Sequence, residues 1–244
     1  MVDPRTSMIG ERLKRIGRII AVSSGKGGVG KSLVATVLAL TLAKKGCRVG
    51  LFDLDFTSPS THMILGIGED VQPKEEKGVV PPVVHGLEYM SLVYYSQDQV
   101  TPLRGTDVSN ALIELLVITR WSKLDFLIID MPPGIGDAVL DVIRLVRNIE
   151  FLIVTTPSQL AFETVKKLAS LLRDLKVPII GVVENMKMNQ AGDVQQQTEK
   201  LGVAFLGEIP YDAKVEGAIG DETRLLKTVL AKKIMEIAMD IIVK

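Results

Sequence analysis

Cysteine is almost absent from this sequence: Cys47 is the only one among 244 residues. A lone thiol cannot close an intrachain disulfide, and disulfides are what small secreted domains use to hold their folds together. We therefore expect a cytoplasmic protein.

An excess of either charge is also missing. Lys and Arg together number 29, as do Asp and Glu, so the formal net charge is zero. Binding to nucleic acid usually requires a basic surplus, because phosphates must be neutralised. Nucleic acid is therefore not expected as the main partner.

Long hydrophobic runs are absent as well. The first residues, MVDPRTSMIGERLKRI, are charged throughout, unlike a secretory signal peptide. The apolar runs elsewhere are far shorter than the roughly 20 residues that a membrane-spanning helix needs. A membrane is therefore not expected as a partner.

What is present is a regular alternation of short apolar runs with segments of helical period. Two runs, 126–129 and 151–154, are apolar at consecutive positions, which is typical of strands covered by helices on both faces. The alternation predicts an α/β fold with one doubly wound, mostly parallel sheet flanked by helices. Strands are expected at 18–22, 48–53, 87–93, 124–130, 151–155, 179–184 and 203–206. Helices are expected at 31–45, 107–120, 137–147, 161–176, 193–201 and 223–243.

We predict a single domain over residues 1–244, because a chain of this length with 47% hydrophobic residues can bury one core. Residues 1–17 are expected to form a helical arm docked on the body, with a detachable arm that binds a partner as the alternative. Residues 223–243 are expected to form a helix that closes the core, with a membrane-binding amphipathic helix as the alternative. Residues 66–86 are expected to form an irregular excursion from this one domain and not a domain boundary.

The segment GKGGVGKS at residues 25–32 fits the pattern G-x-x-x-x-G-K-[ST] of a phosphate-binding loop. It lies between an expected strand and an expected helix, and its glycines allow successive amides to turn toward phosphate oxygens. Lys31 is expected to reach the β- and γ-phosphates, and the Ser32 hydroxyl to bind Mg²⁺. The alternative is a plain glycine-rich turn. The nucleotide-binding residues predicted here are Gly25, Lys26, Gly27, Gly28, Val29, Gly30, Lys31, Ser32 and Leu33.

Carboxylates follow two of the expected strands. Asp53 and Asp55 end the run LFDLD, where alternation along an extended chain directs both toward the carboxyl edge of the sheet. Asp130 ends the run FLIID and opens a turn that reaches Gly134, whose amide is expected to face the γ-phosphate. One carboxylate can hold Mg²⁺ through water while another orients the attacking water. The predicted Mg²⁺ ligands are Ser32, Asp53 and Asp130.

The base of the nucleotide is expected at two later turns. Asn185 follows the expected strand at 179–184, and its carboxamide can read the amine and ring nitrogen of adenine. Pro210 and Asp212, in GEIPYD, are expected to close over the ring. No N-K-x-D pattern for guanine is present, so ATP is favoured over GTP.

These motifs together resemble the Mrp/MinD branch of P-loop ATPases, and most of all its ApbC-like group. The stretches that carry the resemblance are VSSGKGGVGKS, DLDFTSPSTHMILG, TPLRGTDVSNAL, LDFLIIDMPPGIGD, TTPSQLAFETVKK and GVVENM. The resemblance implies a homodimer that hydrolyses ATP with Mg²⁺ and in which Lys26 reaches the nucleotide of the other subunit. It also implies that Asp55 is the hydrolysis aspartate, so the predicted catalytic residues are Lys26, Lys31 and Asp55.

One departure from that group concerns its cargo. Iron–sulfur carriers of the group hold a bridging cluster on a C-x-x-C pair shortly after ENM, whereas this chain continues MKMNQAGDVQQQ. Without that pair the chain looks like the archaeal HypB-type subgroup, which implies nickel delivery to [NiFe] hydrogenase together with a HypA-type metallochaperone. The alternatives are an iron–sulfur assembly ATPase without its own cluster and a MinD-like spatial regulator at a membrane. His62, His85, Met186 and Met188 are expected to be structural.

Overall fold

A computed structural model describes residues 4–56, 58–96, 106–188 and 193–243, and it confirms the predicted α/β fold. One sheet holds the order β10-β9-β8-β1-β7-β2-β6-β5, in which only β5 runs antiparallel to its neighbour. Its strands are β1 (Ile16–Ser23), β2 (Val49–Asp53), β5 (Val83–Val84), β6 (Leu87–Ser91), β7 (Leu124–Asp130), β8 (Ile149–Thr155), β9 (Ile179–Lys187) and β10 (Phe205–Pro210). Part of the expected motif TPLRGTDVSNAL, at 101–105, lies outside the described residues.

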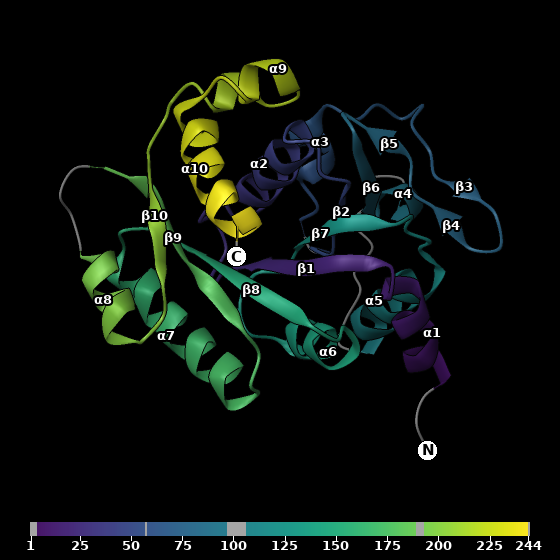
Figure 1. Cartoon of the computed structure of the whole chain (residues 1–244), viewed down its shortest axis with the longest axis horizontal. Helices are drawn as coiled ribbons and strands as arrows, with labels where there is room; N and C mark the ends of the chain where they lie inside the picture. Colours follow the sequence, from purple (N-terminus) through teal and green to yellow (C-terminus); the bar gives the residue numbers. More distant parts are fainter. Residues whose placement is uncertain (1–3, 57, 97–105, 189–192, 244) are drawn as a thin grey trace.

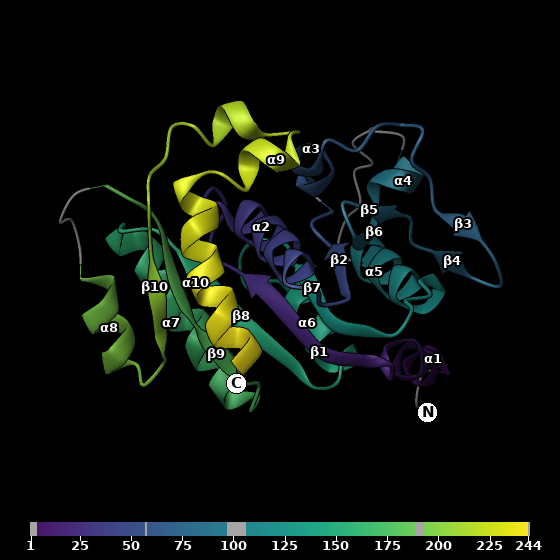
Figure 2. The same ribbon diagram turned by 45° about the horizontal axis from the view of Figure 1, so that its top comes forward.

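Helices cover both faces of this sheet (Figures 1 and 2). The helices are α1 (Pro4–Leu13), α2 (Lys31–Lys44), α3 (Thr61–Leu65), α4 (Val93–Ser96), α5 (Thr106–Ile118), α6 (Asp137–Leu145), α7 (Gln159–Asp174), α8 (Val194–Lys200), α9 (Glu222–Leu225) and α10 (Val229–Val243), with a short 3-10 turn at Glu216–Ala218. In β1, Ile19 and Ala21 pack into the core beneath α5, α6 and α7, while Ile20 and Val22 pack into the core beneath α2 and α10. Consecutive apolar residues therefore serve two cores, which is the reason for the continuous hydrophobic runs.

Several predicted element boundaries shift by a few residues: β9 continues past Asn185 to Lys187, and β10 runs from Phe205 to Pro210, so Asn185 and Pro210 lie within strands and not after them. Two further boundaries are corrected. The expected arm at 1–17 is a helix only as far as Leu13, because Ile16 and Gly17 already belong to β1, where Ile16 pairs with Leu124 of β7. Ile9 and Leu13 are buried against the body. The expected helix at 223–243 is two helices, α9 and α10, since Thr228 interrupts it and its hydroxyl accepts a hydrogen bond from the amide of Ala231.

The excursion at 66–86 carries a short antiparallel pair, β3 (Lys74–Glu75) and β4 (Val79–Val80), before β5. Arg12 of α1 donates to the carbonyl oxygen of Lys77 in this excursion and to that of Val117 in α5. The excursion and α1 are thus joined to the body by the same guanidinium group.

Among the described residues, no helix combines the length and apolarity that crossing a bilayer requires.

Candidate functional site

The phosphate-binding loop predicted at residues 25–32 joins β1 to α2, as expected from the motif. Gly28 and Gly30 have φ angles of 78° and 80°, a conformation that favours glycine. A Cβ atom on Gly30 would lie 2.3 Å from Nδ2 of Asn185, so this position also needs glycine for space. Nδ2 of Asn185 donates to the carbonyl oxygen of Val29 at 2.9 Å, which supports the loop from β9.

The first glycine of the loop is required by a neighbouring helix. A Cβ atom on Gly25 would lie 2.3 Å from the Cβ atom of Thr164 in α7. Ser24, just before it, is buried and its hydroxyl donates to the carbonyl oxygen of Lys26 at 2.9 Å. The close approach of α7 therefore explains why the loop begins with a residue that has no side chain.

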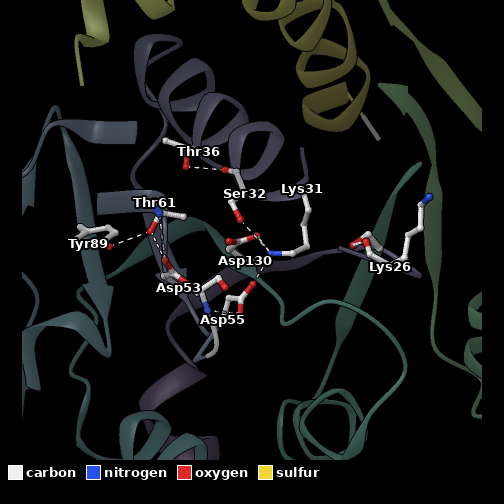
Figure 3. Close-up of polar contacts among 11 residues, drawn as sticks. Lys26, Lys31, Ser32, Thr36, Asp53, Asp55, Thr61, Tyr89 and Asp130 are labelled. Carbon is white, nitrogen blue, oxygen red and sulfur yellow. Dashed lines mark hydrogen bonds and ion pairs between the residues drawn. The ribbon is translucent and has the colours of Figure 1, made fainter. Parts of the chain in front are cut away.

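Lys31 lies among the carboxylates predicted to form the site (Figure 3). Its Nζ atom is 2.6 Å from Oδ1 of Asp130 and 3.7 Å from Oδ2 of Asp55, and it donates to the Ser32 hydroxyl at 3.2 Å. Lys31 and Asp55 are each 6% exposed, and Asp130 is fully buried. A lysine charge, a carboxylate at the end of β7 and a carboxylate in the loop after β2 therefore meet at the first turn of α2.

The register of the parallel strands brings Asp53 and Asp130 together. Asp53 at the end of β2 is directly opposite Asp130 at the end of β7, and Asp130 is opposite Val22 of β1. Burial raises the pKa of both carboxyl groups, that of Asp130 to about 7, although the nearby Lys31 opposes this rise. The carboxyl edge of the central strands is where ligands bind in open α/β sheets.

Asp53 and Asp55 differ in how their oxygens are used. The oxygens of Asp53 accept hydrogen bonds from the amide of Asp55 and from the amide and hydroxyl of Thr61. Oδ1 of Asp55 accepts a bond from the amide of Ser58 at 3.2 Å, while its Oδ2 faces Lys31. Asp53 therefore organises the loop after β2, and Asp55 turns one oxygen toward the lysine.

The donor set at Asp130 fits the Mg²⁺ ion that P-loop NTPases use. Oδ2 of Asp130 is buried and has no hydrogen-bond partner among the described residues. The Ser32 hydroxyl lies beside the same lysine that binds the other oxygen of Asp130. A carboxylate and a hydroxyl are oxygen donors of the kind that Mg²⁺ prefers. Asp53, by contrast, has both oxygens engaged by protein donors, so it fits a role through water better than direct ligation.

The turn after β7 is tied to the phosphate-binding loop. The amide of Met131 donates to the carbonyl oxygen of Val22 at 3.1 Å, and the amide of Gly134 donates to that of Ser24 at 2.9 Å. Gly134 has a φ angle of 87°. The sequence assigns this amide to the γ-phosphate, but here the carbonyl oxygen of Ser24 occupies it, so binding a phosphate would require the turn to move.

The residues predicted to bind the base surround a cavity of about 170 Å³, formed by Leu33, Asn185, Met186, Pro210, Tyr211, Asp212, Ala213, Val215, Glu216, Ile219 and Leu230. Asn185 lines it while its amide nitrogen supports Val29. Asp212 accepts hydrogen bonds from the amides of Lys214 and Val229, so it also caps the start of α10. The cavity is mainly apolar, as a pocket for an aromatic ring should be.

Lys26 does not join the cluster around Lys31. Its side chain is exposed and is directed away from the carboxylates (Figure 3). This orientation leaves its charge accessible from outside the molecule. The predicted role of Lys26, which requires a second copy of the chain, stays a prediction.

Cys47 lies at the amino edge of the sheet, opposite the carboxyl edge that carries the phosphate-binding loop. It precedes the amino end of β2, whereas the phosphate-binding loop follows the carboxyl end of the parallel strand β1. Burial, assisted by the charge of Asp125, raises the pKa of the thiol. The described residues contain no group of three or more His, Cys, Asp and Glu side chains able to hold a metal. A single thiol cannot supply the cysteine pair that a bridging cluster needs.

Two residues of the site escape the sequence analysis. Thr61 and Tyr89 are fully buried, and their oxygens lie 2.9 Å apart next to Asp53. Thr61 has a weak local signal, since it stands at the start of a helix in a stretch rich in Ser and Thr. Tyr89 has none, because it reaches the site only through the pairing of β6 with β2.

The matching family model and the similar proteins of known sequence point to the same family. Residues 15–244 match the family model described as ParA, NUBPL iron-transfer P-loop NTPase. An iron–sulfur cluster carrier protein of Pyrococcus furiosus is 37% identical over 270 residues, covering 100% of this chain and 92% of the relative. The carrier of Pseudomonas fragi is 45% identical over 181 residues, 72% of this chain. This chain spans 63% of that relative and 60% of the carrier of Aquifex aeolicus.

Solved structures share the fold. A nucleotide-binding protein of Archaeoglobus fulgidus, in complex with ADP and with Co found by PIXE, has a TM-score of 0.77 and 32% identity, over 91% of this chain and 93% of the other. The cell division ATPase MinD of Pyrococcus furiosus has a TM-score of 0.70 at 22% identity, over 92% and 98% of the two chains, which extends the likeness of fold alone.

Proposed function

Because this chain belongs to the ParA/NUBPL family of iron-transfer P-loop NTPases, we propose that it is an ATP-hydrolysing switch that assists iron–sulfur cluster assembly. The observation that carries the hydrolytic part is the cluster of Lys31, Asp55 and Asp130 at the first turn of α2, beside a phosphate-binding loop. The relatives that are named as cluster carriers support the iron–sulfur part.

Each residue has a role in this proposal that follows from its position. The loop amides and Lys31 bind the phosphates of ATP, and the amide of Gly134 leaves the carbonyl oxygen of Ser24 to bind the γ-phosphate. Asp55 orients a water molecule that attacks the γ-phosphorus, so that the bond to the bridging oxygen breaks and ADP and phosphate leave. The apolar cavity at Asn185 and Pro210 takes the adenine ring.

Ser32 and Asp130 would hold Mg²⁺ directly and Asp53 would hold it through water, and the bound ion would supply positive charge that stabilises the phosphates during transfer. We expect phosphate release from ATP to require Mg²⁺ and to stop when the ion is chelated. Release at the same rate with and without a chelator would contradict this part of the proposal.

Lys26 provides a separate test, because its proposed target is the nucleotide of a second copy. Lys26→Ala is expected to bind ATP with an affinity within about threefold of the parent, since Lys31 remains, yet to fail to form ATP-dependent dimers. The oligomeric state is measured by light scattering after size exclusion, in an Asp55→Asn background that retains ATP.

The matched control for Lys26→Ala is Lys45→Ala, which removes an exposed lysine just after the far end of α2. That variant should dimerise as the parent does. Normal ATP-dependent dimers from Lys26→Ala would remove the proposed reach across the interface.

The proposed cargo differs from the one that the sequence predicts. Delivery of nickel to [NiFe] hydrogenase is the main expectation from sequence, but the relatives favour its iron–sulfur alternative. Cys47 is the only thiol of these 244 residues, and it lies at the edge of the sheet remote from the loop. We therefore propose that this chain drives cluster assembly on a partner and does not hold a bridging cluster on a cysteine pair of its own.

The experiment for this proposal is affinity capture from native extract with the Asp55→Asn variant, in ATP and in ADP, followed by mass spectrometry. Recovery of iron–sulfur scaffold or acceptor proteins in one nucleotide state supports the proposal. Recovery of a nickel metallochaperone would restore the nickel interpretation, and recovery of cell-positioning proteins would favour a MinD-like regulator. A parallel reconstitution with iron and sulfide should give no cluster absorbance on the purified chain.

A further inference from the structure

Thr61 and Tyr89 form a hydrogen-bonded pair on the side of Asp53 that is away from Lys31 (Figure 3). The Thr61 hydroxyl donates to Oδ2 of Asp53 at 2.6 Å. A threonine hydroxyl has one proton, so with that proton directed to Asp53 its oxygen accepts from the Tyr89 hydroxyl. The hydrogen bonds therefore run in one direction, from Tyr89 through Thr61 to Asp53.

Asp53 connects the Thr61 hydroxyl to the main chain at Asp55. Oδ2 of Asp53 also accepts from the Thr61 amide at 3.3 Å, and Oδ1 accepts from the Asp55 amide at 3.0 Å. One carboxylate thereby links the end of β2, the main chain at Asp55 and the first residue of α3. The position of Asp55 relative to Lys31 depends on where Asp53 is held.

The helix that carries Thr61 is fixed at its other end. Gly66, which ends α3, has a φ angle of 66°, and a Cβ atom on it would lie 2.3 Å from the carbonyl oxygen of Gly220. The amide of Gly220 in turn donates to the carbonyl oxygen of Ile64 at 3.2 Å. Because backbone packs against backbone at this point, α3 is a firm support for the Thr61 hydroxyl.

We propose that Thr61, oriented by Tyr89, is a positioning residue that fixes Asp53 and through it the main chain of Asp55 for ATP hydrolysis. This inference rests on the proposed hydrolytic role of Asp55. Thr61 acts through Asp53, while Lys31 and the loop amides bind the phosphates. Its loss therefore slows turnover and leaves the affinity for ATP largely unchanged.

The test replaces one group at a time. Thr61→Val keeps the shape and removes the hydroxyl, and we expect kcat to fall about tenfold while the Kd for ATP stays within about threefold. Thr61→Ser keeps the hydroxyl and should stay within about threefold of the parent kcat. Tyr89→Phe removes the outer donor alone and should lower kcat about threefold.

Two matched controls separate this role from general damage to the fold. Thr198→Val removes another buried threonine hydroxyl, which donates to the carbonyl oxygen of Val194 in α8 at 2.7 Å. Tyr94→Phe removes a hydroxyl that has no hydrogen-bond partner among the described residues, from a ring packed edge-on against Tyr89 at 5.8 Å. Both controls should keep the parent kcat.

A second measurement does not depend on hydrolysis. Hydrogen–deuterium exchange of the backbone around Asp55 should be faster in Thr61→Val than in the parent, while exchange in β1 and β7 is unchanged. Parent-like kcat in Thr61→Val, equal loss in Thr61→Ser, or unaltered exchange near Asp55 would each overturn the inference. If the parent itself did not hydrolyse ATP, the proposed function would fail, and the exchange measurement would still decide whether Thr61 positions Asp55.

Discussion

Removal of the Lys31 charge is expected to weaken ATP binding about 100-fold, or about 3 kcal/mol, as is usual for the loss of a buried charge-assisted contact. Lys31→Met is the preferred change because it keeps the aliphatic stem that packs at the first turn of α2. The affinity of the parent and of the variant is measured by titration calorimetry with ATP. A Kd within about threefold of the parent would exclude Lys31 as the main phosphate cation.

The fold should survive this change, for a reason that the site itself provides. Lys31 lies 2.6 Å from the buried carboxyl group of Asp130, whose pKa is already about 7. Without the lysine the pKa of Asp130 rises further, so this group becomes neutral at neutral pH and does not remain as a buried charge. Thermal unfolding followed by circular dichroism checks this, and an unfolded variant would make its lost affinity uninformative about the phosphate contact. Lys31→Arg, which keeps a charge, then serves as the second variant.

Much of the fold and of the phosphate-binding loop is predictable because the signals are local. The continuous apolar runs predict strands buried on both faces, and Ile19 and Ile20 pack into the two opposite cores. The spacing of glycines, lysine and serine in residues 25–32 predicts a loop between strand and helix, which is where it lies. Parallel strands then place Asp53 and Asp130 at one edge.

The parts that escape prediction depend on contacts between distant residues. Tyr89 reaches Thr61 because β6 pairs with β2, and no spacing rule links them. Ile16 fits a helical period, but pairing with Leu124 places it in a strand, so tertiary structure overrides the local pattern. The break between α9 and α10 at Thr228, by contrast, could have been predicted, since a threonine able to cap a new helix is visible in the sequence.

Asp212 illustrates how one residue can satisfy two expectations. The sequence assigns it to the base, and it does line the cavity beside Asn185. Its oxygens also accept hydrogen bonds from the amides of Lys214 and Val229, which the sequence does not reveal. A variant at this position would therefore disturb the start of α10 together with the cavity, so it is a poor test of base recognition.

Asp55→Asn is expected to lower kcat for ATP hydrolysis at least about 100-fold while the Kd for ATP stays within about threefold, because the variant loses the charge that orients the attacking water. Asparagine keeps the size of the side chain and an oxygen that can accept the hydrogen bond from the Ser58 amide. Phosphate release is measured at saturating ATP, and the affinity is measured separately by calorimetry.

The control for Asp55→Asn is Asp240→Asn, the same chemical change at an exposed position of α10, which should leave both constants as in the parent. Asp55 faces Lys31 at 3.7 Å, so neutralising it also removes one partner of the lysine. If that pairing were its whole role, the lysine would be freed for phosphate, and the variant would bind ATP more tightly without losing turnover. Slow turnover at unchanged affinity therefore points to the water, whereas tighter binding at the parent rate would transfer the hydrolytic role to another carboxylate of the site.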